Sequence, residues 1–146
     1  MSEGASSERG AKDLRVFVYG ILQPGEAAWP SLCEGRVVEA TPARIRGRLY
    51  SFGRYPAVRT GGESWVYGSL LQLADPEALA AFDDLEGYEE GRAPEENEYN
   101  RIRVACEDRT GAALGEAWIY EMSEERIVAL GGEPVPGGSW PPEKSG

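Results

Sequence analysis

Apolar and polar positions alternate along several short stretches of the chain, which is the pattern of half-buried β-strands. The clearest stretch is ARIRGRLY, residues 43–50, where small or apolar residues alternate with three arginines. Residues 101–106 alternate in the same way, and after a short turn sequence, EDRTG, residues 113–122 return as a strand. Residues 14–19 are almost continuously apolar, as in a strand covered on both faces, and 65–73 form a further strand. The pattern predicts a protein built mainly of strands.

One helix is expected among these strands, at residues 75–87. Asp75 is a favourable N-cap residue, and Pro76 suits the first helical position because its missing N–H is not needed there. Gly87 occupies the position at which glycine commonly ends a helix.

Glycines interrupt three of the expected strands, and such positions suggest bulges or bends: Gly47, Gly68 and Gly115. We therefore expect an α+β fold, a small mixed, curled or barrel-like β-sheet with one main flanking helix. The length suggests a single domain. We assign it to residues 14–130, after a disordered N-terminal segment at 1–13 and before an irregular C-terminal tail at 131–146.

Composition narrows the choice of partners and compartment. The net charge of −10 disfavours a nucleic-acid partner, since phosphate binding needs clustered Lys and Arg. No apolar run approaches the roughly 20 residues that span a bilayer, and the first residues lack the apolar core of a secretory signal. The two cysteines, Cys33 and Cys106, form neither a disulfide framework nor a CxxC site, and the pattern predicts Cys106 in the core. We expect a cytoplasmic protein that contacts no membrane.

The sequence contains no histidine. Ser-His-Asp and Cys-His systems are therefore excluded, as are histidine zinc sites, and we expect no metal. Neither a P-loop nor a GxGxxG motif occurs, and we expect no cofactor. Acid–base chemistry near neutral pH would fall to a carboxylate, lysine, tyrosine or cysteine with a shifted pKa.

Glu86 is the candidate carboxylate, because helical spacing places it on the apolar face defined by Leu79 and Phe82. Burial and the negative end of the helix dipole would both raise its pKa, and a close Asp83 would add like-charge repulsion. Two other readings stay open. The acidic residues that follow the helix would mostly be solvated, and Leu85 could take the inward role and turn Glu86 to the rim.

Six short motifs resemble, in order and spacing, the γ-glutamylcyclotransferase-like superfamily, which includes the AIG2-like proteins. They are VFVYGILQPG at 16–25, YPAV at 55–58, VYGSL at 66–70, DDLEGY at 83–88, YNR at 99–101 and AWIY at 117–120. The resemblance covers roughly residues 14–122. It implies a γ-glutamylcyclotransferase-like fold and activity, with Glu86 as catalytic acid/base.

The resemblance also implies a substrate cavity and a reaction. The backbone N–H groups of Gly20, Ile21 and Leu22 would hold the substrate's α-carboxylate or its reacting carbonyl. Ile21 stands where the family usually has Thr or Ser, which bears on the identity of the substrate. Further cavity-lining candidates are Tyr19, Tyr88, Tyr99, Arg101 and Tyr120. The expected partner is a small-molecule γ-glutamyl amine, cyclised to 5-oxoproline with release of the free amine and without a cofactor.

Alternatives stay open at this point. The tyrosines would serve equally as amphipathic core residues, and Arg101 as an outward strand charge. The same cavity could belong to a non-enzymatic module that binds a small molecule or a peptide terminus. A two-carboxylate hydrolase using Asp83 or Asp84 with Glu86 is disfavoured, since these residues are too close together on one helix end. The leaving amine and the oligomeric state are not specified by the sequence.

Overall fold

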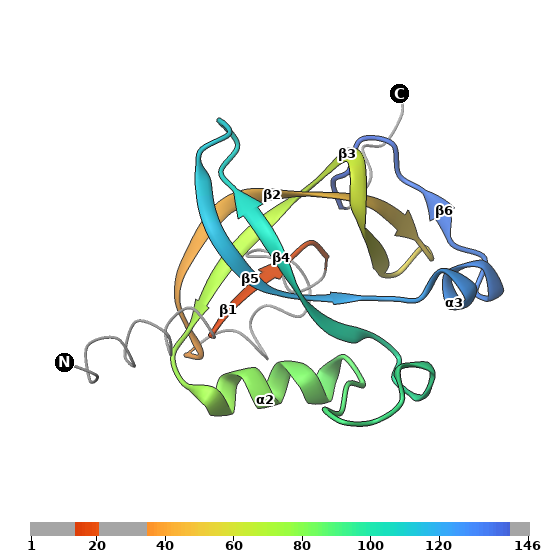
Figure 1. Cartoon of the computed structure of the whole chain (residues 1–146), viewed down its shortest axis with the longest axis horizontal. Helices are drawn as coiled ribbons and strands as arrows, with labels where there is room; N and C mark the ends of the chain where they lie inside the picture. Colours follow the sequence, from red (N-terminus) through yellow and green to blue (C-terminus); the bar gives the residue numbers. More distant parts are fainter. Residues whose placement is uncertain (1–13, 21–34, 141–146) are drawn as a thin grey trace.

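The computed structural model describes residues 14–20 and 35–140. Their elements follow the α+β class expected from the sequence (Figure 1). In chain order they are β1 (Arg15–Val18), β2 (Val37–Ser51), β3 (Pro56–Leu73), α2 (Pro76–Leu85), the 3-10 helix η2 (Pro94–Glu96), β4 (Asn100–Glu107), β5 (Ala113–Glu121), α3 (Glu124–Ala129) and β6 (Glu133–Pro134).

Within the described part of the chain, five strands close into a mixed β-barrel. The sheet order is β3-β1-β5-β4-β2-β6, and β2 also pairs with β3, which closes the ring. Most pairs are antiparallel, but β1 runs parallel to β5, with Val16 opposite Trp118. Figure 1 shows α2 lying along one end of this barrel and α3 following β5. The predicted barrel-like sheet with one main helix is confirmed.

The strands β2 and β3 form a long antiparallel hairpin. The predicted alternation in β2 is confirmed, because Ala43, Ile45 and Leu49 are buried. The predicted strand at 65–73 is only the second half of β3, which begins at Pro56. The register passes from Arg46–Trp65 directly to Gly47–Thr60, so residues 61–64 bulge out of the ladder and are exposed. Residues 60–64, TGGES, are polar and do not alternate, so the pattern of apolar positions does not indicate that the strand continues through them.

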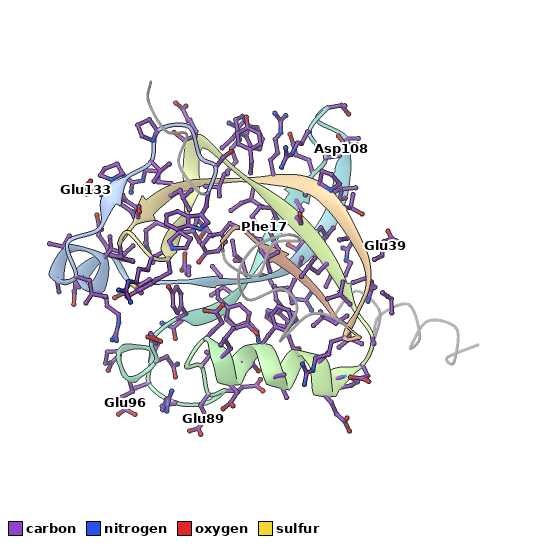
Figure 2. All side chains as sticks on the ribbon, turned by 180° about the vertical axis from the view of Figure 1, so that it is seen from behind. Phe17, Glu39, Glu89, Glu96, Asp108 and Glu133 are labelled. Carbon is purple, nitrogen blue, oxygen red and sulfur yellow. The ribbon has the colours of Figure 1, made fainter. Side chains whose placement is uncertain are left out.

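Strand β1 is buried on both faces, as its apolar sequence predicts. Val16 and Val18 face one core cluster together with Phe82 of α2. Phe17 faces the barrel interior, and Figure 2 shows it at the middle of the molecule. The close approach of β1 to β3 requires Gly68, because a Cβ at this position would overlap the carbonyl oxygen of Val18. The strand glycine therefore permits closure of the barrel.

The helix α2 forms as its capping residues predict. The Asp75 side chain accepts a hydrogen bond from the N–H of Ala78 at 2.9 Å, and Gly87 has the positive φ of 65° that glycine adopts readily. Phe82 is fully buried, whereas Leu85 is 48 % exposed. Leu85 therefore does not take the inward position, and Glu86 stays on the face of α2 that is turned toward the barrel.

The segment after residue 130 packs against the barrel up to residue 140. Its β6 pairs with the end of β2, and the N–H of Val135 donates to the carbonyl of Leu49 at 2.8 Å. The carbonyl of Gly138 accepts from Tyr67 at 2.8 Å, and Trp140 packs on the barrel core. The sequence pattern did not predict this packing, because the contacts of the segment are irregular and produce no regular alternation of apolar residues. The expectations for residues 1–13 and 141–146 lie outside the described residues.

Among the helices in the described ranges, none combines the length and the apolar character needed to cross a membrane.

Candidate functional site

A cavity of about 350 Å³ opens where α2 meets the end of the barrel. Segments far apart in the sequence converge on it: the end of β1, the turn before β3, the end of α2, the start of β4 and the end of β5. Its lining residues are Phe17, Val18, Tyr19, Gly20, Arg54, Tyr55, Pro56, Leu85, Glu86, Glu98, Tyr99 and Tyr120. Of the predicted site residues, Glu86, Tyr19, Gly20, Tyr99 and Tyr120 are thus brought together.

Glu86 is the C-cap residue of α2, and its side chain lines the cavity. Its N–H donates to the carbonyl of Phe82 at 3.0 Å, and its carbonyl accepts from the N–H of Tyr99 at 3.2 Å. Burial, and secondly the nearby Glu98 carboxylate, raise the pKa of Glu86 to about 8. The pKa is thus raised as the sequence suggested, but the like-charged neighbour is Glu98 and not Asp83.

Glu98 is a cavity residue that the sequence analysis missed. It is exposed at the cavity rim, and its N–H donates to the carbonyl of Gly87 at 3.1 Å. A Cβ on Gly87 would lie only 2.9 Å from the Cβ of Glu98, so glycine allows the two segments to approach. No periodicity links positions 86 and 98, because a loop brings them together.

The loop between Gly87 and β4 is organised by a buried amide, Asn97, which is only 3 % exposed. Its Oδ1 accepts from the N–H of Glu89 at 3.1 Å and from Nε of Arg92 at 2.7 Å, and its Nδ2 donates to Asn100 at 2.9 Å. The acidic side chains of this loop mostly face solvent, and Figure 2 shows Glu89 and Glu96 pointing away from the barrel. The expected solvated role of these charges is confirmed.

Three of the tyrosines that line the cavity are buried. Tyr19, Tyr99 and Tyr120 are each less than 8 % exposed. Burial is the main reason that the pKa of each is raised, and the negative charge of Glu86 contributes in all three cases. These tyrosines therefore stay protonated at neutral pH, which leaves Glu86 as the lining group with a pKa near neutrality.

The cavity floor contains a tight contact between Gly20 and Pro56. A Cβ on Gly20 would lie 2.6 Å and 2.8 Å from two ring carbons of Pro56, so only glycine fits without displacement. Pro56 is the second residue of the YPAV motif, and its ring makes this contact, although the sequence analysis did not name Pro56 as a site residue. Ile21 and Leu22, the other predicted N–H donors, lie outside the described residues.

Tyr88 and Arg101 are not among the residues that line the cavity. The Arg101 guanidinium instead forms an ion pair with Asp83 at 2.9 Å, and its side chain is 8 % exposed. It lies 4.5 Å from the ring centre of Trp118 and 5.2 Å from that of Tyr88. Arg101 is therefore packed under α2, which differs from both the cavity and the outward position considered from the sequence.

Among the described residues, no group of three or more carboxylates, histidines or cysteines could hold a metal. Cys106 is buried as predicted, and burial raises the pKa of its thiol to about 11, which disfavours the reactive thiolate. Cys33 lies outside the described residues.

Comparison with known proteins identifies the family of this chain and solved structures with a similar fold. The model of the family described as "Gamma-glutamyl cyclotransferase, AIG2-like" matches residues 16–142, so this chain belongs to that family. A Vibrio cholerae protein named "Putative gamma-glutamylcyclotransferase" is 31 % identical over 126 residues, which span 86 % of this chain and 93 % of that protein.

Solved structures with the same fold include YkqA from Bacillus subtilis, with a TM-score of 0.61 and 24 % identity over 88 % of this chain. This chain spans only 39 % of YkqA, and the likeness concerns the fold alone. The solution structure of ytfP from Escherichia coli has a TM-score of 0.54 and 25 % identity, and it covers 87 % of this chain and 96 % of ytfP.

Proposed function

We propose that this protein is an enzyme of the γ-glutamylcyclotransferase type, which converts a small γ-glutamyl amine into 5-oxoproline and the free amine. The observation that carries the proposal is Glu86, a carboxylate that lines the cavity and whose pKa is raised to about 8. General acid–base catalysis is most effective when the pKa of the catalytic group lies near the working pH. Family membership supports the same reaction.

The reaction is an internal transamidation. The α-amino nitrogen of the substrate forms a bond to its own γ-carbonyl carbon, and the bond from that carbon to the leaving nitrogen breaks. Glu86 takes the proton that the attacking nitrogen releases and returns it to the leaving nitrogen, so no net proton is gained or lost. The cavity supplies proximity by holding the folded-back substrate, and proximity is a large part of such catalysis.

The developing negative charge on the γ-carbonyl oxygen needs hydrogen-bond donors. We assign this role, or the binding of the α-carboxylate, to the backbone N–H groups at residues 20–22, of which Gly20 lies at the described cavity floor. Neither a metal nor a cofactor takes part in this scheme. The partner is the small-molecule substrate, with no role for nucleic acid or membrane.

The test is a screen of γ-glutamyl compounds for release of 5-oxoproline and amine. The wild-type protein is compared with Glu86→Gln and with a matched control, Glu90→Gln, which removes an exposed carboxylate from the adjacent loop. We expect Glu86→Gln to lose about 10² to 10⁴-fold in kcat and Glu90→Gln to keep full turnover. Activity retained in Glu86→Gln would refute the assignment of Glu86, and binding without turnover by the wild type would favour the non-enzymatic module.

A further inference from the structure

The last turn of α2, which leads into Glu86, has little apolar packing to hold it against the barrel. The buried residues of this helix are Ala78 and Phe82. Beyond Phe82, Leu85 is 48 % exposed, so its side chain is not anchored in the core. The next apolar side chain that packs on the core is Tyr88, which follows the helix. Polar contacts therefore have to fix the turn that carries Glu86.

Arg101 of β4 supplies such contacts on both sides of Glu86. Three residues before Glu86, the Asp83 carboxylate accepts hydrogen bonds from Nη1 of Arg101 at 2.9 Å and 3.1 Å. Two residues after Glu86, the ring centre of Tyr88 lies 5.2 Å from Cζ of Arg101, within the range of a cation–π contact. The ring centre of Trp118 in β5 lies 4.5 Å from the same atom. One side chain thus ties both flanks of Glu86 to the β4–β5 hairpin.

Two further hydrogen bonds join the same elements. The hydroxyl of Tyr120 in β5 donates to Oδ1 of Asp83 at 2.6 Å, and the N–H of Tyr99 donates to the carbonyl of Glu86 at 3.2 Å. The ion pair is shielded from solvent, because the Arg101 side chain is 8 % exposed and that of Asp83 is 21 % exposed. The end of α2 is therefore held in one geometry relative to the strands.

The stability of the fold does not explain why a charged cluster holds this turn. A buried ion pair contributes little net stability, because taking two charges out of water costs about as much as their attraction returns. In addition, Nε of Arg101 is buried and has no hydrogen-bond partner among the described residues. An unsatisfied buried donor lowers stability further. The arrangement therefore indicates a role in geometry.

We propose that Arg101 is a positioning residue for Glu86, acting through Asp83 and Tyr88 to keep the Glu86 carboxylate in the cavity. Asp83, Tyr88 and Arg101 are not among the described residues that line the cavity, so none of them is assigned a contact with substrate. The pKa of Glu86 is raised by burial and by the Glu98 carboxylate. Arg101 therefore acts on the place of the carboxylate and not through its own charge. The inference rests on the proposed function for its effect on turnover.

The test compares an ion pair that is broken with one that is removed completely. Arg101→Met leaves Asp83 unpaired, whereas the double variant Arg101→Met/Asp83→Asn removes both charges and keeps similar volumes. Arg101→Met should melt at least about 5 °C below the wild type, and the double variant should regain most of that loss. In both variants, kcat for the release of 5-oxoproline should stay about 10 to 100-fold below the wild type, with KM changed less than about threefold. A cluster that only stabilises the fold would regain kcat together with the melting temperature.

A second measurement follows Glu86 without any substrate. The side-chain carboxyl carbon of Glu86 is titrated by carbon-13 NMR, and its signal is identified by its absence from the spectrum of Glu86→Gln. In the double variant, a less buried carboxylate should titrate at least about one pH unit below the wild-type pKa of about 8. The matched control is Arg44→Met/Glu107→Gln, which removes an ion pair between β2 and β4. It should leave the Glu86 titration and kcat unchanged.

The outcomes separate this inference from the proposed function. A double variant with wild-type kcat, or one in which Glu86 titrates as in the wild type, overturns the positioning role. If the wild type turns over no γ-glutamyl compound, the proposed function fails, and the titration of Glu86 still decides this inference. If the double variant does not fold, Arg101→Lys replaces it, because lysine keeps the charge but loses the planar group that contacts Asp83 and the two neighbouring rings. It should lower the pKa of Glu86 in the same direction, and an unchanged value would overturn the proposal.

Discussion

Replacing Glu86 by glutamine should make the protein more stable, and by an amount that grows with pH. The pKa of Glu86 is about 8 in the folded protein, against an ordinary value of 4.5. Between these values the unfolded chain has released this proton but the folded protein retains it, so the free energy of unfolding falls as pH rises. The stability is fully present below pH 4.5 and is lost as pH rises through 8. Glutamine does not titrate and removes this dependence.

The magnitude follows from the two pKa values. Each pH unit between them corresponds to about 1.4 kcal/mol, which gives a ceiling of about 5 kcal/mol above pH 8. Because Glu86 lines an open cavity and is only partly buried, water screens the charge and we expect about half of that ceiling. A gain of about 2 to 3 kcal/mol would move the urea midpoint by roughly 1 M for a domain of this size.

The assay is urea unfolding of wild type and Glu86→Gln at pH 4, 7 and 9, followed by circular dichroism. The two proteins should coincide at pH 4 and separate at pH 9. Glu89→Gln, which removes an exposed carboxylate from the neighbouring loop, should follow the wild type throughout. If the difference between Glu86→Gln and the wild type stays constant with pH, Glu86 is not a desolvated carboxylate and the reasoning fails.

Three further predictions concern the surroundings of Glu86. Removing the Glu98 charge in Glu98→Gln should lower the pKa of Glu86 and shift the rising limb of the kcat/KM–pH profile to lower pH, so an unchanged or higher midpoint would contradict this coupling. Asn97→Ala should cost about 2 to 3 kcal/mol in urea unfolding, because it leaves buried hydrogen-bond donors without an acceptor. Gly20→Ala should destabilise the protein by about 1 to 3 kcal/mol and weaken 5-oxoproline binding, since the new methyl group overlaps Pro56. If the variant instead keeps the melting temperature and affinity of the wild type, the cavity floor can shift to accept the methyl group.

A glycine with open surroundings provides the control for the last variant. No atom outside the adjacent residues lies within 4 Å of a Cβ built on Gly137, so Gly137→Ala should change neither stability nor binding.

The parts of the fold that depend on neighbouring residues could be predicted from the sequence. The limits of α2 follow from Asp75, Pro76 and Gly87, whose effects act within one turn. The inward face of β2 follows from alternation alone. The beginning of β3 could not be found in this way, because the bulge at 61–64 interrupts the period that identifies a strand.

The site was predicted only where its residues carry a local signal. Glu86 is conspicuous as a carboxylate on an apolar helix face, and three tyrosines and Gly20 belong to recognisable motifs. Glu98 has no such signal, since its place at the cavity depends on a loop closed by backbone hydrogen bonds to Gly87. Arg101 looked like either a ligand-binding residue or a surface charge, and only the tertiary structure reveals its pairing with Asp83 under the helix.

The position of β1 in the barrel has a consequence for how the protein folds. Val16 pairs with Leu71 on one side and Trp118 on the other, so this strand is synthesised first but its neighbours emerge much later. Pairings of such large sequence separation form slowly, whereas the β2–β3 hairpin can form from adjacent chain. Since Tyr19 and Gly20 directly follow β1, the cavity forms only when β1 is paired with β5, the barrel strand that is synthesised last. A ribosome-bound chain shorter than β5 therefore has a hairpin and a helix but no site.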